Sequence, residues 1–241
     1  MVYRTDTEWG RDRYTTQEDV LRRGSKRVES IAEAIERTTG ATLEGRTALD
    51  YGCGVGRIAV PLAERCEHVY GMDLSAPILR DASANAERRG LTNFEAVGVP
   101  QLDGLAGRYD LLISLNVLQH IRTRDGESVF ERLVKGLRPG GVGFVNVVVR
   151  PPRPLRSVLR WTFPPRHARK RDRRRHRLNP SNLFRAMDFS YAYMMRRSYS
   201  LDRLALVLAA AGIDTWHVQY NLNPERHGFD SLALIFEKPE T

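Results

Sequence analysis

The sequence predicts an α/β fold, in which a doubly wound, mostly parallel seven-stranded sheet carries helices on both faces and has a lid-like insert. Two observations predict it. From Arg46 onward, short apolar runs alternate with helical segments, which is the pattern of parallel strands joined by crossover helices. The apolar runs are rich in Val, Ile and Leu, as expected of strands that are covered on both faces.

The first predicted element is a helix over residues 16–38. Thr16 and Asp19 have the spacing of a capping box, in which side chains satisfy the free N–H groups of the first turn. Four apolar residues are spaced for one buried stripe, namely Val28, Ile31, Ala32 and Ile35.

The alternating elements follow this helix. We predict strands at 47–51, 68–73, 94–99, 109–115 and 142–149, and helices at 57–65, 76–89 and 125–137. The motif LRPGG, residues 137–141, supplies the Pro and Gly that end the last of these helices. Further along, a helix at 201–211 is closed by Gly212, and strand candidates at 213–220 and 231–238 complete the sheet.

Composition excludes several classes of protein. Two cysteines, Cys53 and Cys66, are too few for a disulfide framework or a four-thiolate zinc site. No run approaches the roughly 20 apolar residues of a membrane span, and the start, MVYRTDTEWGRDRY, lacks the apolar stretch of a secretory signal. We therefore expect a cytoplasmic protein.

A glycine-rich loop follows the first predicted strand, in the sequence Asp50-Tyr51-Gly52-Cys53-Gly54-Val55-Gly56. The glycines allow a ligand to approach the backbone. Asp73 ends the second strand, 21 residues after Gly52, which is the spacing at which a carboxylate can bind a ribose diol. The alternative is a structural turn followed by a helix-capping Asp.

Two details indicate which nucleotide the loop binds. A dinucleotide-binding loop needs glycine at position 57, where this chain has Arg57. Asp50 would repel a pyrophosphate but attract an ammonium group. A ligand with a ribose, an ammonium group and no phosphate is S-adenosylmethionine.

Three segments together resemble the class I S-adenosylmethionine-dependent methyltransferases: ALDYGCGVGRIAVPLAERCEHVYGMDLS, YDLLISLNVLQHI and GLRPGGVGFV. The resemblance covers residues 28–149 well and the C-terminal part loosely. It implies a strand order of 3-2-1-4-5-7-6 with the seventh strand antiparallel. The length of the chain and its alternating pattern predict one domain over 1–241, with an N-terminal helical segment (1–45), a cofactor-binding core (46–149), a basic insert or lid (150–199), and a C-terminal helix with two strands (200–241).

The resemblance also assigns site residues. Asp50, Gly52 and Gly54, with Cys53 between the glycines, would surround the methionine moiety of the cofactor. Asp73 would bind the ribose.

Three further positions complete the expected cofactor site. Leu74 would lie against the adenine, and Asn116 near the sulfonium. Many members of the family carry an acidic residue where this chain has Val99, so adenine contacts there would come from the backbone.

His120 is the candidate catalytic base, because an imidazole titrates at about pH 6.5 and a hydroxyl acceptor benefits from proton removal. The alternative is a histidine that packs or hydrogen-bonds locally. No catalytic metal is evident, because the acids of the insert and of segments 99–126 form no recognisable cluster, although Asp103, Asp125 and Asp188 stay open as candidate ligands. A group of aromatic and methionine residues belongs to a lid, to the wall of the acceptor pocket or to the core. These residues are Tyr191, Tyr193, Met194, Met195 and Tyr199.

The basic run at 166–177 concentrates the charge of the chain. It holds seven Arg, one Lys and one Asp, so its net charge of +7 accounts for most of the chain's +9. Such a run is either a solvated loop or a binding element for an anionic membrane surface or a phosphorylated acceptor. Binding to a membrane surface would make the protein peripheral there.

Three function classes follow, in order of preference. The first is methyl transfer to a small-molecule acceptor, at a hydroxyl oxygen of a sugar, a lipid-linked compound or a secondary metabolite. The second is an RNA or protein methyltransferase that uses the basic run, although charge confined to one segment makes nucleic acid the weaker candidate. The third is a non-catalytic binding or membrane-associated protein of the same fold. No pattern specifies an oligomeric state.

Overall fold

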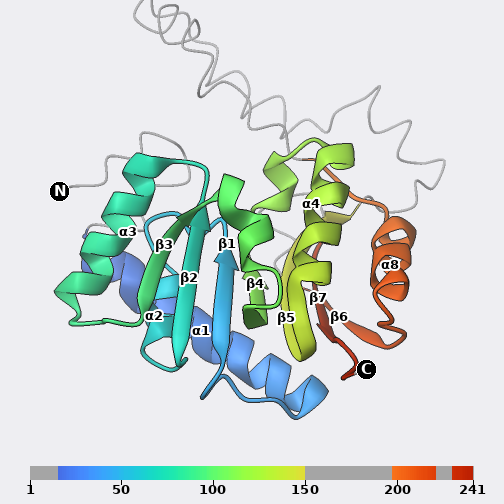
Figure 1. Cartoon of the computed structure of the whole chain (residues 1–241), viewed down its shortest axis with the longest axis horizontal. Helices are drawn as coiled ribbons and strands as arrows, with labels where there is room; N and C mark the ends of the chain where they lie inside the picture. The colour runs from blue at the N-terminus through green and yellow to red at the C-terminus, as the bar shows by residue number, and fades with distance from the viewer. Residues whose placement is uncertain (1–15, 150–196, 221–229, 241) are drawn as a thin grey trace, which may run out of the picture. The chain divides into compact units, whose positions relative to one another are not determined.

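The structure, a computed structural model, describes residues 16–149, 197–220 and 230–240. Within these ranges the chain forms one seven-stranded sheet (Figure 1). The strands are β1 (Thr47–Tyr51), β2 (His68–Asp73), β3 (Phe94–Gly98), β4 (Tyr109–Ser114), β5 (Leu137–Val149), β6 (Trp216–Tyr220) and β7 (Asp230–Glu237). Their order is β3-β2-β1-β4-β5-β7-β6, and β7 runs antiparallel to both of its neighbours. The predicted strand order and the antiparallel seventh strand are both confirmed.

Helices cover both faces of this sheet (Figure 1). On one face lie α1 (Gln17–Thr39), α2 (Ala59–Ala63) and α3 (Ala76–Arg88), which share a core with the sheet. The other face packs against the 3-10 helix η1 (Val99–Leu105), α4 (Thr123–Gly136) and α8 (Leu201–Ala210). A short 3-10 turn, η2 (Leu118–His120), follows β4.

Consecutive residues of the central strands enter opposite cores, because side chains alternate across a strand. In β4, Leu111 packs on the α1 side of the sheet and Leu112 on the α4 side. Phe144 and Val145 of β5 divide in the same way. All four side chains are at most 2% exposed, which explains why these strands are apolar throughout.

Helix α1 begins as its sequence predicts, and Thr16 Oγ1 accepts the backbone N–H of Asp19 at 3.2 Å. Val28, Ile31 and Ile35 of the expected stripe are at most 1% exposed. Ala32 is only half-buried, however, and Ala34 takes its place in the core. The buried face of α1 is therefore rotated slightly around the helix axis from the predicted stripe.

Most predicted elements shift by one to three residues at one or both ends, and three differences have a clear structural reason. The helix expected at 57–65 is only the five residues of α2, because the turns of the glycine loop continue through Ile58. The third strand ends at Gly98, since Val99 already begins η1. The fifth strand begins at Leu137, which pairs with Tyr109, so LRPGG is an irregular start of β5 as well as the end of a helix.

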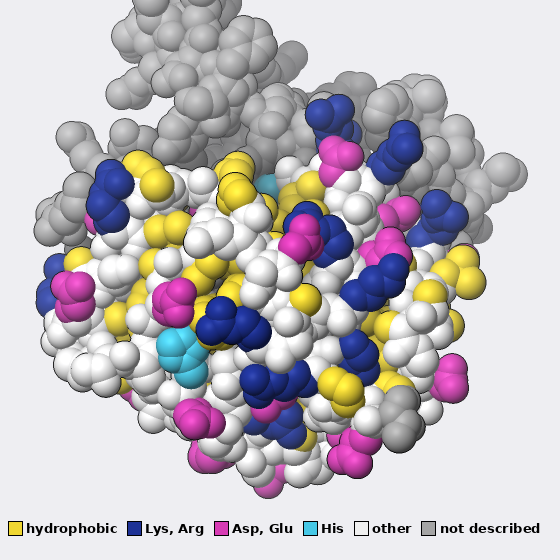
Figure 2. All heavy atoms as spheres, in the orientation of Figure 1, with side chains coloured by type: hydrophobic (Ala, Val, Ile, Leu, Met, Phe, Trp, Pro, Cys, Tyr) yellow, Lys and Arg dark blue, Asp and Glu magenta, His cyan; other side chains and the backbone are white. Residues whose placement is uncertain are grey.

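Several predictions fall on residues that the structure does not describe. Most of the insert expected at 150–199 lies outside the described residues, with the basic run at 166–177 and four of the five candidate lid residues, 191 to 195. The single-domain organisation therefore stays a prediction. On the face shown in Figure 2, Lys and Arg side chains are interspersed with Asp and Glu. Within the described ranges, no helix has both the length and the apolar composition of a membrane span.

Candidate functional site

The glycine loop leaves the carboxyl end of β1 with a backbone that suits glycine. Gly52 has φ 80° and Gly54 has φ 56°, in the left-handed region that other residues rarely adopt. A Cβ on Gly52 would lie 2.1 Å from Cγ2 of Val117, so this glycine lets the loop after β4 pack directly against the glycine loop. A Cβ on Gly54 would meet nothing within 4 Å. A ligand can therefore approach the backbone at Gly54.

Backbone hydrogen bonds hold this loop against the end of β2. The N–H groups of Gly52 and Cys53 both donate to the carbonyl oxygen of Met72, at 2.7 and 2.9 Å. The N–H of Gly54 donates to Oδ2 of Asp73 at 3.1 Å. The two motifs that the sequence singled out, the glycine loop and Asp73, are thus in direct contact.

Asp50 lies in β1 beneath this loop, with its side chain almost fully buried. The residue is 2% exposed, and its Oδ2 has no hydrogen-bond partner among the described residues. Burial raises the pKa of this carboxyl from its ordinary value of 3.8 to about 7, although the positive charge of Arg57 and a backbone hydrogen bond from Ala59 act in the opposite direction. An unpaired buried carboxylate is costly, so the site favours a cationic ligand group at Oδ2.

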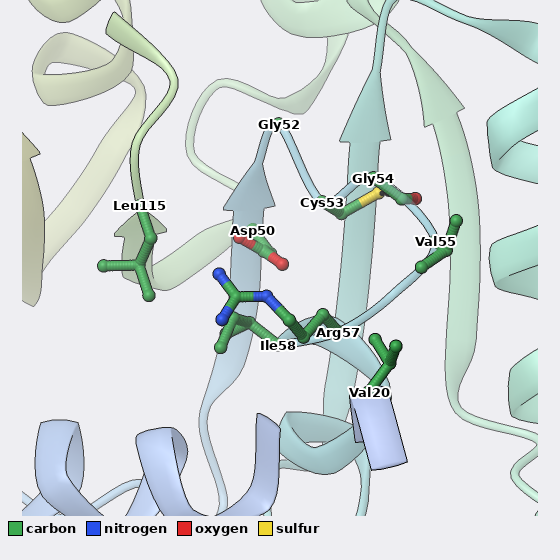
Figure 3. A pocket seen from close by; sticks show the side chains of 9 residues that line it. All are labelled: Val20, Asp50, Gly52, Cys53, Gly54, Val55, Arg57, Ile58 and Leu115. Carbon is green, nitrogen blue, oxygen red and sulfur yellow. Dashed lines mark hydrogen bonds between the residues drawn. The ribbon is translucent and has the colours of Figure 1, made fainter. Parts of the chain in front are cut away.

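A cavity of about 210 Å³ lies next to Asp50 (Figure 3). The side chains of Asp50 and Arg57 both point into this space. The lining residues are Val20, Asp50, Gly52, Cys53, Gly54, Val55, Arg57, Ile58 and Leu115. A carboxylate and a guanidinium side by side suit a ligand that carries both an ammonium and a carboxylate group, as the α-amino acid end of a molecule does.

Helix α1 closes this side of the site, and it carries a second arginine. A Cβ on Gly24 would lie 1.8 Å from the carbonyl oxygen of Arg57, so α1 packs directly on the loop backbone. Burial, and then the positive charge of Arg57, lower the pKa of Arg27. Two neighbouring guanidinium groups favour an anion between or beside them. The sequence analysis missed Arg27, and its only signal was its place next to Val28 of the buried stripe.

Asp73 and Leu74 lie together where β2 ends. Asp73 Oδ1 accepts the N–H of Ser75 at 3.1 Å, while Oδ2 accepts the N–H of Gly54. Each carboxylate oxygen has a second lone pair, so hydroxyl groups of a ligand can still donate to it. Leu74 is 83% exposed, and an apolar side chain this accessible beside Asp73 offers a surface for a flat apolar group.

Val99 follows β3 and contributes differently. It is half-buried, begins η1 and packs against the core on the α4 side of the sheet. Adenine contacts from the backbone at this edge stay a prediction.

Asn116 and His120 lie on the loop that follows β4. Asn116 is the one described residue other than glycine with a positive φ, 62°, and such conformations often occur at functional sites. His120 is exposed, and its Nε2 lies 3.2 Å from Nε2 of the buried Gln119 side chain. This contact is a partner that the sequence did not reveal, and it can orient the imidazole ring.

The structure thus brings four of the expected cofactor residues around one cavity: Asp50, Gly52, Cys53 and Gly54. Burial raises the pKa of the Cys53 thiol, so this residue stays a neutral thiol. The other expected site residues follow the carboxyl ends of neighbouring strands, where ligands bind in open α/β sheets. No group of three or more His, Cys, Asp or Glu in the described ranges is arranged to hold a metal ion.

Comparison with known sequences identifies related proteins. A family model described as "Methyltransferase domain" matches residues 48–141. A protein named ubiquinone biosynthesis O-methyltransferase from Rhizobium leguminosarum bv. trifolii (strain WSM2304) is 28% identical over 192 residues, which are 67% of this chain and 75% of the relative. A protein of the same name from Caulobacter vibrioides is 31% identical over 53% of each chain. This chain therefore spans three quarters of one of these relatives and about half of the other.

Comparison with solved structures supports the fold. Magnesium protoporphyrin IX methyltransferase from Synechocystis PCC 6803, solved with bound SAH (S-adenosylhomocysteine), has a TM-score of 0.59 at 19% identity and covers 93% of this chain and 89% of its own. A structure described as a putative methyltransferase from Bacillus halodurans C-125 has a TM-score of 0.57 at 15% identity, and covers 89% of this chain and 98% of its own. At these identities the likeness shows the fold.

Proposed function

Because this chain belongs to the class I S-adenosylmethionine-dependent methyltransferases, we propose that it transfers a methyl group to a hydroxyl oxygen of a small-molecule acceptor. One observation carries the proposal. The loop after β4, which carries the exposed His120, packs directly against the glycine loop through the contact between Val117 and Gly52.

The residues at the cavity fit the cofactor. The partnerless Oδ2 of Asp50 would accept hydrogen bonds from its ammonium group. Arg57, with the neighbouring positive charge of Arg27, would bind the carboxylate of the methionine moiety. The open backbone at Gly54 leaves room for the ligand chain. When bound, S-adenosylmethionine supplies a methyl group that is already activated by a positively charged sulfur.

The ribose and adenine would lie beyond the cavity. Asp73 would accept hydrogen bonds from the ribose hydroxyls while it keeps its own bonds to Gly54 and Ser75. Leu74 would cover one face of the adenine, which would bury a side chain that is otherwise 83% exposed. Backbone atoms near Val99 would contact the edge of the base.

On the acceptor side, His120 would remove the proton of the hydroxyl group as the new bond forms. Gln119 would keep the imidazole in one orientation through the contact at 3.2 Å. Asn116, on the loop after β4, would lie near the reacting atoms. Much of the rate enhancement would come from holding the acceptor oxygen in line with the methyl group.

The names of the relatives support oxygen as the methylated atom, because both are O-methyltransferases. A screen with radiolabelled S-adenosylmethionine tests this proposal. Phenols, glycosides, lipid-linked hydroxyl compounds and RNA would each be offered at low and at high salt. We expect saturable transfer of one methyl group to a hydroxyl compound with little salt dependence. Transfer to RNA alone, with strong salt dependence, would reject the proposal in favour of nucleic acid.

A further inference from the structure

Tyr199 is a buried tyrosine whose hydroxyl group lies at the loop after β4. It is 1% exposed, and its Oη donates to the carbonyl oxygen of Leu118 at 2.7 Å and lies 3.3 Å from that of Ile121. The space for this hydroxyl depends on Gly126 of α4. A Cβ at that position would lie 1.9 Å from Oη.

The turn that Tyr199 contacts is the one that presents His120. Within η2 the N–H of His120 donates to Val117 O, and the N–H of Ile121 donates to Leu118 O, both at 2.9 Å. A single 3-10 turn of this kind has few hydrogen bonds of its own and poor geometry in each. It therefore depends on neighbouring segments to stay in one conformation.

The neighbouring segment that supports η2 is residues 197–199. The N–H of Arg197 donates to Gln119 O at 2.8 Å, next to the two carbonyl groups that Tyr199 contacts. On its other side, the N–H of Tyr199 donates to Val148 O at 2.8 Å, at the end of β5. Because β5 is paired with both β4 and β7 in the sheet, its position is fixed, and it stabilises the position of residues 197–199.

We propose that Tyr199 is a positioning residue, which fixes the turn that carries His120 through the hydrogen bonds of its phenol to Leu118 and Ile121. It touches neither acceptor nor cofactor in this role. Its effect on catalysis rests on the proposed function, in which His120 is the base. Of the three sequence interpretations of Tyr199, lid, acceptor-pocket wall or plain core, its burial in the core agrees with the last.

The chain offers a matched control for this role. Tyr109 is also fully buried, and its Oη donates to Leu133 O at 2.7 Å. It lies at the amino end of β4, at the opposite end of the strand from His120. Replacing either tyrosine by Phe removes one buried hydroxyl group and its hydrogen bonding, so the two variants should lose similar thermal stability.

The test compares Tyr199→Phe with Tyr109→Phe by hydrogen exchange and by kinetics. In Tyr199→Phe we expect the amides of His120 and Ile121 to exchange about 10-fold faster, while Tyr109→Phe leaves them unchanged. We also expect Tyr199→Phe to lower kcat about 10- to 100-fold, because small displacements of a catalytic group are costly, with the Kd for S-adenosylhomocysteine unchanged. Unchanged exchange at residues 117–121 in Tyr199→Phe would overturn the proposal.

A second variant, at Gly126 of α4, disturbs the same hydroxyl group of Tyr199. Gly126→Ala places a methyl group where the Tyr199 hydroxyl lies, and alanine favours a helix over glycine, so a loss cannot come from a weaker α4. It should reproduce both effects of Tyr199→Phe. Faster exchange without any loss of kcat, in an enzyme that His120→Ala inactivates, would reject the role of Tyr199 in catalysis. If His120→Ala retains full activity, the proposed base is wrong, while the exchange result still decides whether Tyr199 fixes the turn.

Discussion

Replacing Asp50 by Asn should stabilise the protein while weakening its binding of the cofactor. Burial raises the pKa of Asp50 from 3.8 to about 7, so the folded protein at pH 8 holds a carboxylate that its surroundings disfavour. Each unit of pKa shift corresponds to about 1.36 kcal/mol, so a shift of about three pKa units costs up to about 4 kcal/mol of folding free energy. Asparagine has nearly the same shape and carries no charge, so it avoids this cost.

The size of this stability gain depends on pH. Because the pKa of Asp50 is higher in the folded than in the unfolded state, the cost is fully present above pH 7 and disappears as pH falls toward 4. Urea denaturation should therefore show a gain in the unfolding free energy of Asp50→Asn at pH 5 that is less than half of the gain at pH 8. Calorimetry at pH 8 should show about 10- to 150-fold weaker binding of S-adenosylhomocysteine, since the variant loses a charge-assisted hydrogen bond.

Asp110→Asn is the matched control for this experiment. Oδ1 of Asp110 accepts the N–H of Thr47 at 2.8 Å, so this carboxylate already has a partner inside the protein. Neutralising it should destabilise the protein by about 1 kcal/mol and leave cofactor affinity unchanged. An Asp50→Asn variant that is no more stable than the natural protein at pH 8, or that binds the cofactor equally well, would refute the reasoning.

Three further predictions concern the remaining site residues and the basic run. Asp73→Ala should weaken S-adenosylhomocysteine binding about 10- to 150-fold in calorimetry, because it removes the proposed ribose acceptor; unchanged affinity would exclude Asp73 from the site. His120→Ala should lower kcat about 10²- to 10⁴-fold with unchanged cofactor affinity, and the lower limb of the pH profile should disappear; a loss explained by unfolding alone would make the histidine structural. Replacing the three arginines at 173–175 by Ser should raise the acceptor KM or weaken liposome binding, more at low salt; no response in either assay would make the run a solvated loop.

Much of the fold could be predicted because the central strands are apolar on both faces. The alternation of Leu111 and Leu112 between two cores leaves no polar face, and this distinguishes a covered parallel sheet from an exposed one. The strand order came only from the family resemblance, since the residues of a strand do not specify which strand lies beside it.

The parts of the site that could be predicted are close together in sequence or follow a strand. Asp50 and Asp73 fall at the ends of two neighbouring strands, so their proximity follows from the sheet. Arg27 was not predicted, because its one signal, its place next to Val28 of the buried stripe, does not indicate a ligand contact. The role of Tyr199 depends on contacts with residues about 80 positions earlier in the chain, which no local pattern encodes.

Proton release on cofactor binding tests the central claim, that Asp50 receives the ammonium group of the cofactor, most directly. With a pKa of about 7, roughly half of the Asp50 carboxyl groups are protonated at pH 7, and a bound ammonium group would ionise them. Calorimetry of S-adenosylhomocysteine binding at pH 7, in two buffers of different ionisation enthalpy, measures the protons released. We predict about 0.5 proton per molecule bound for the natural protein and none for Asp50→Asn. Equal proton release by both proteins, or none by either, would contradict the claim.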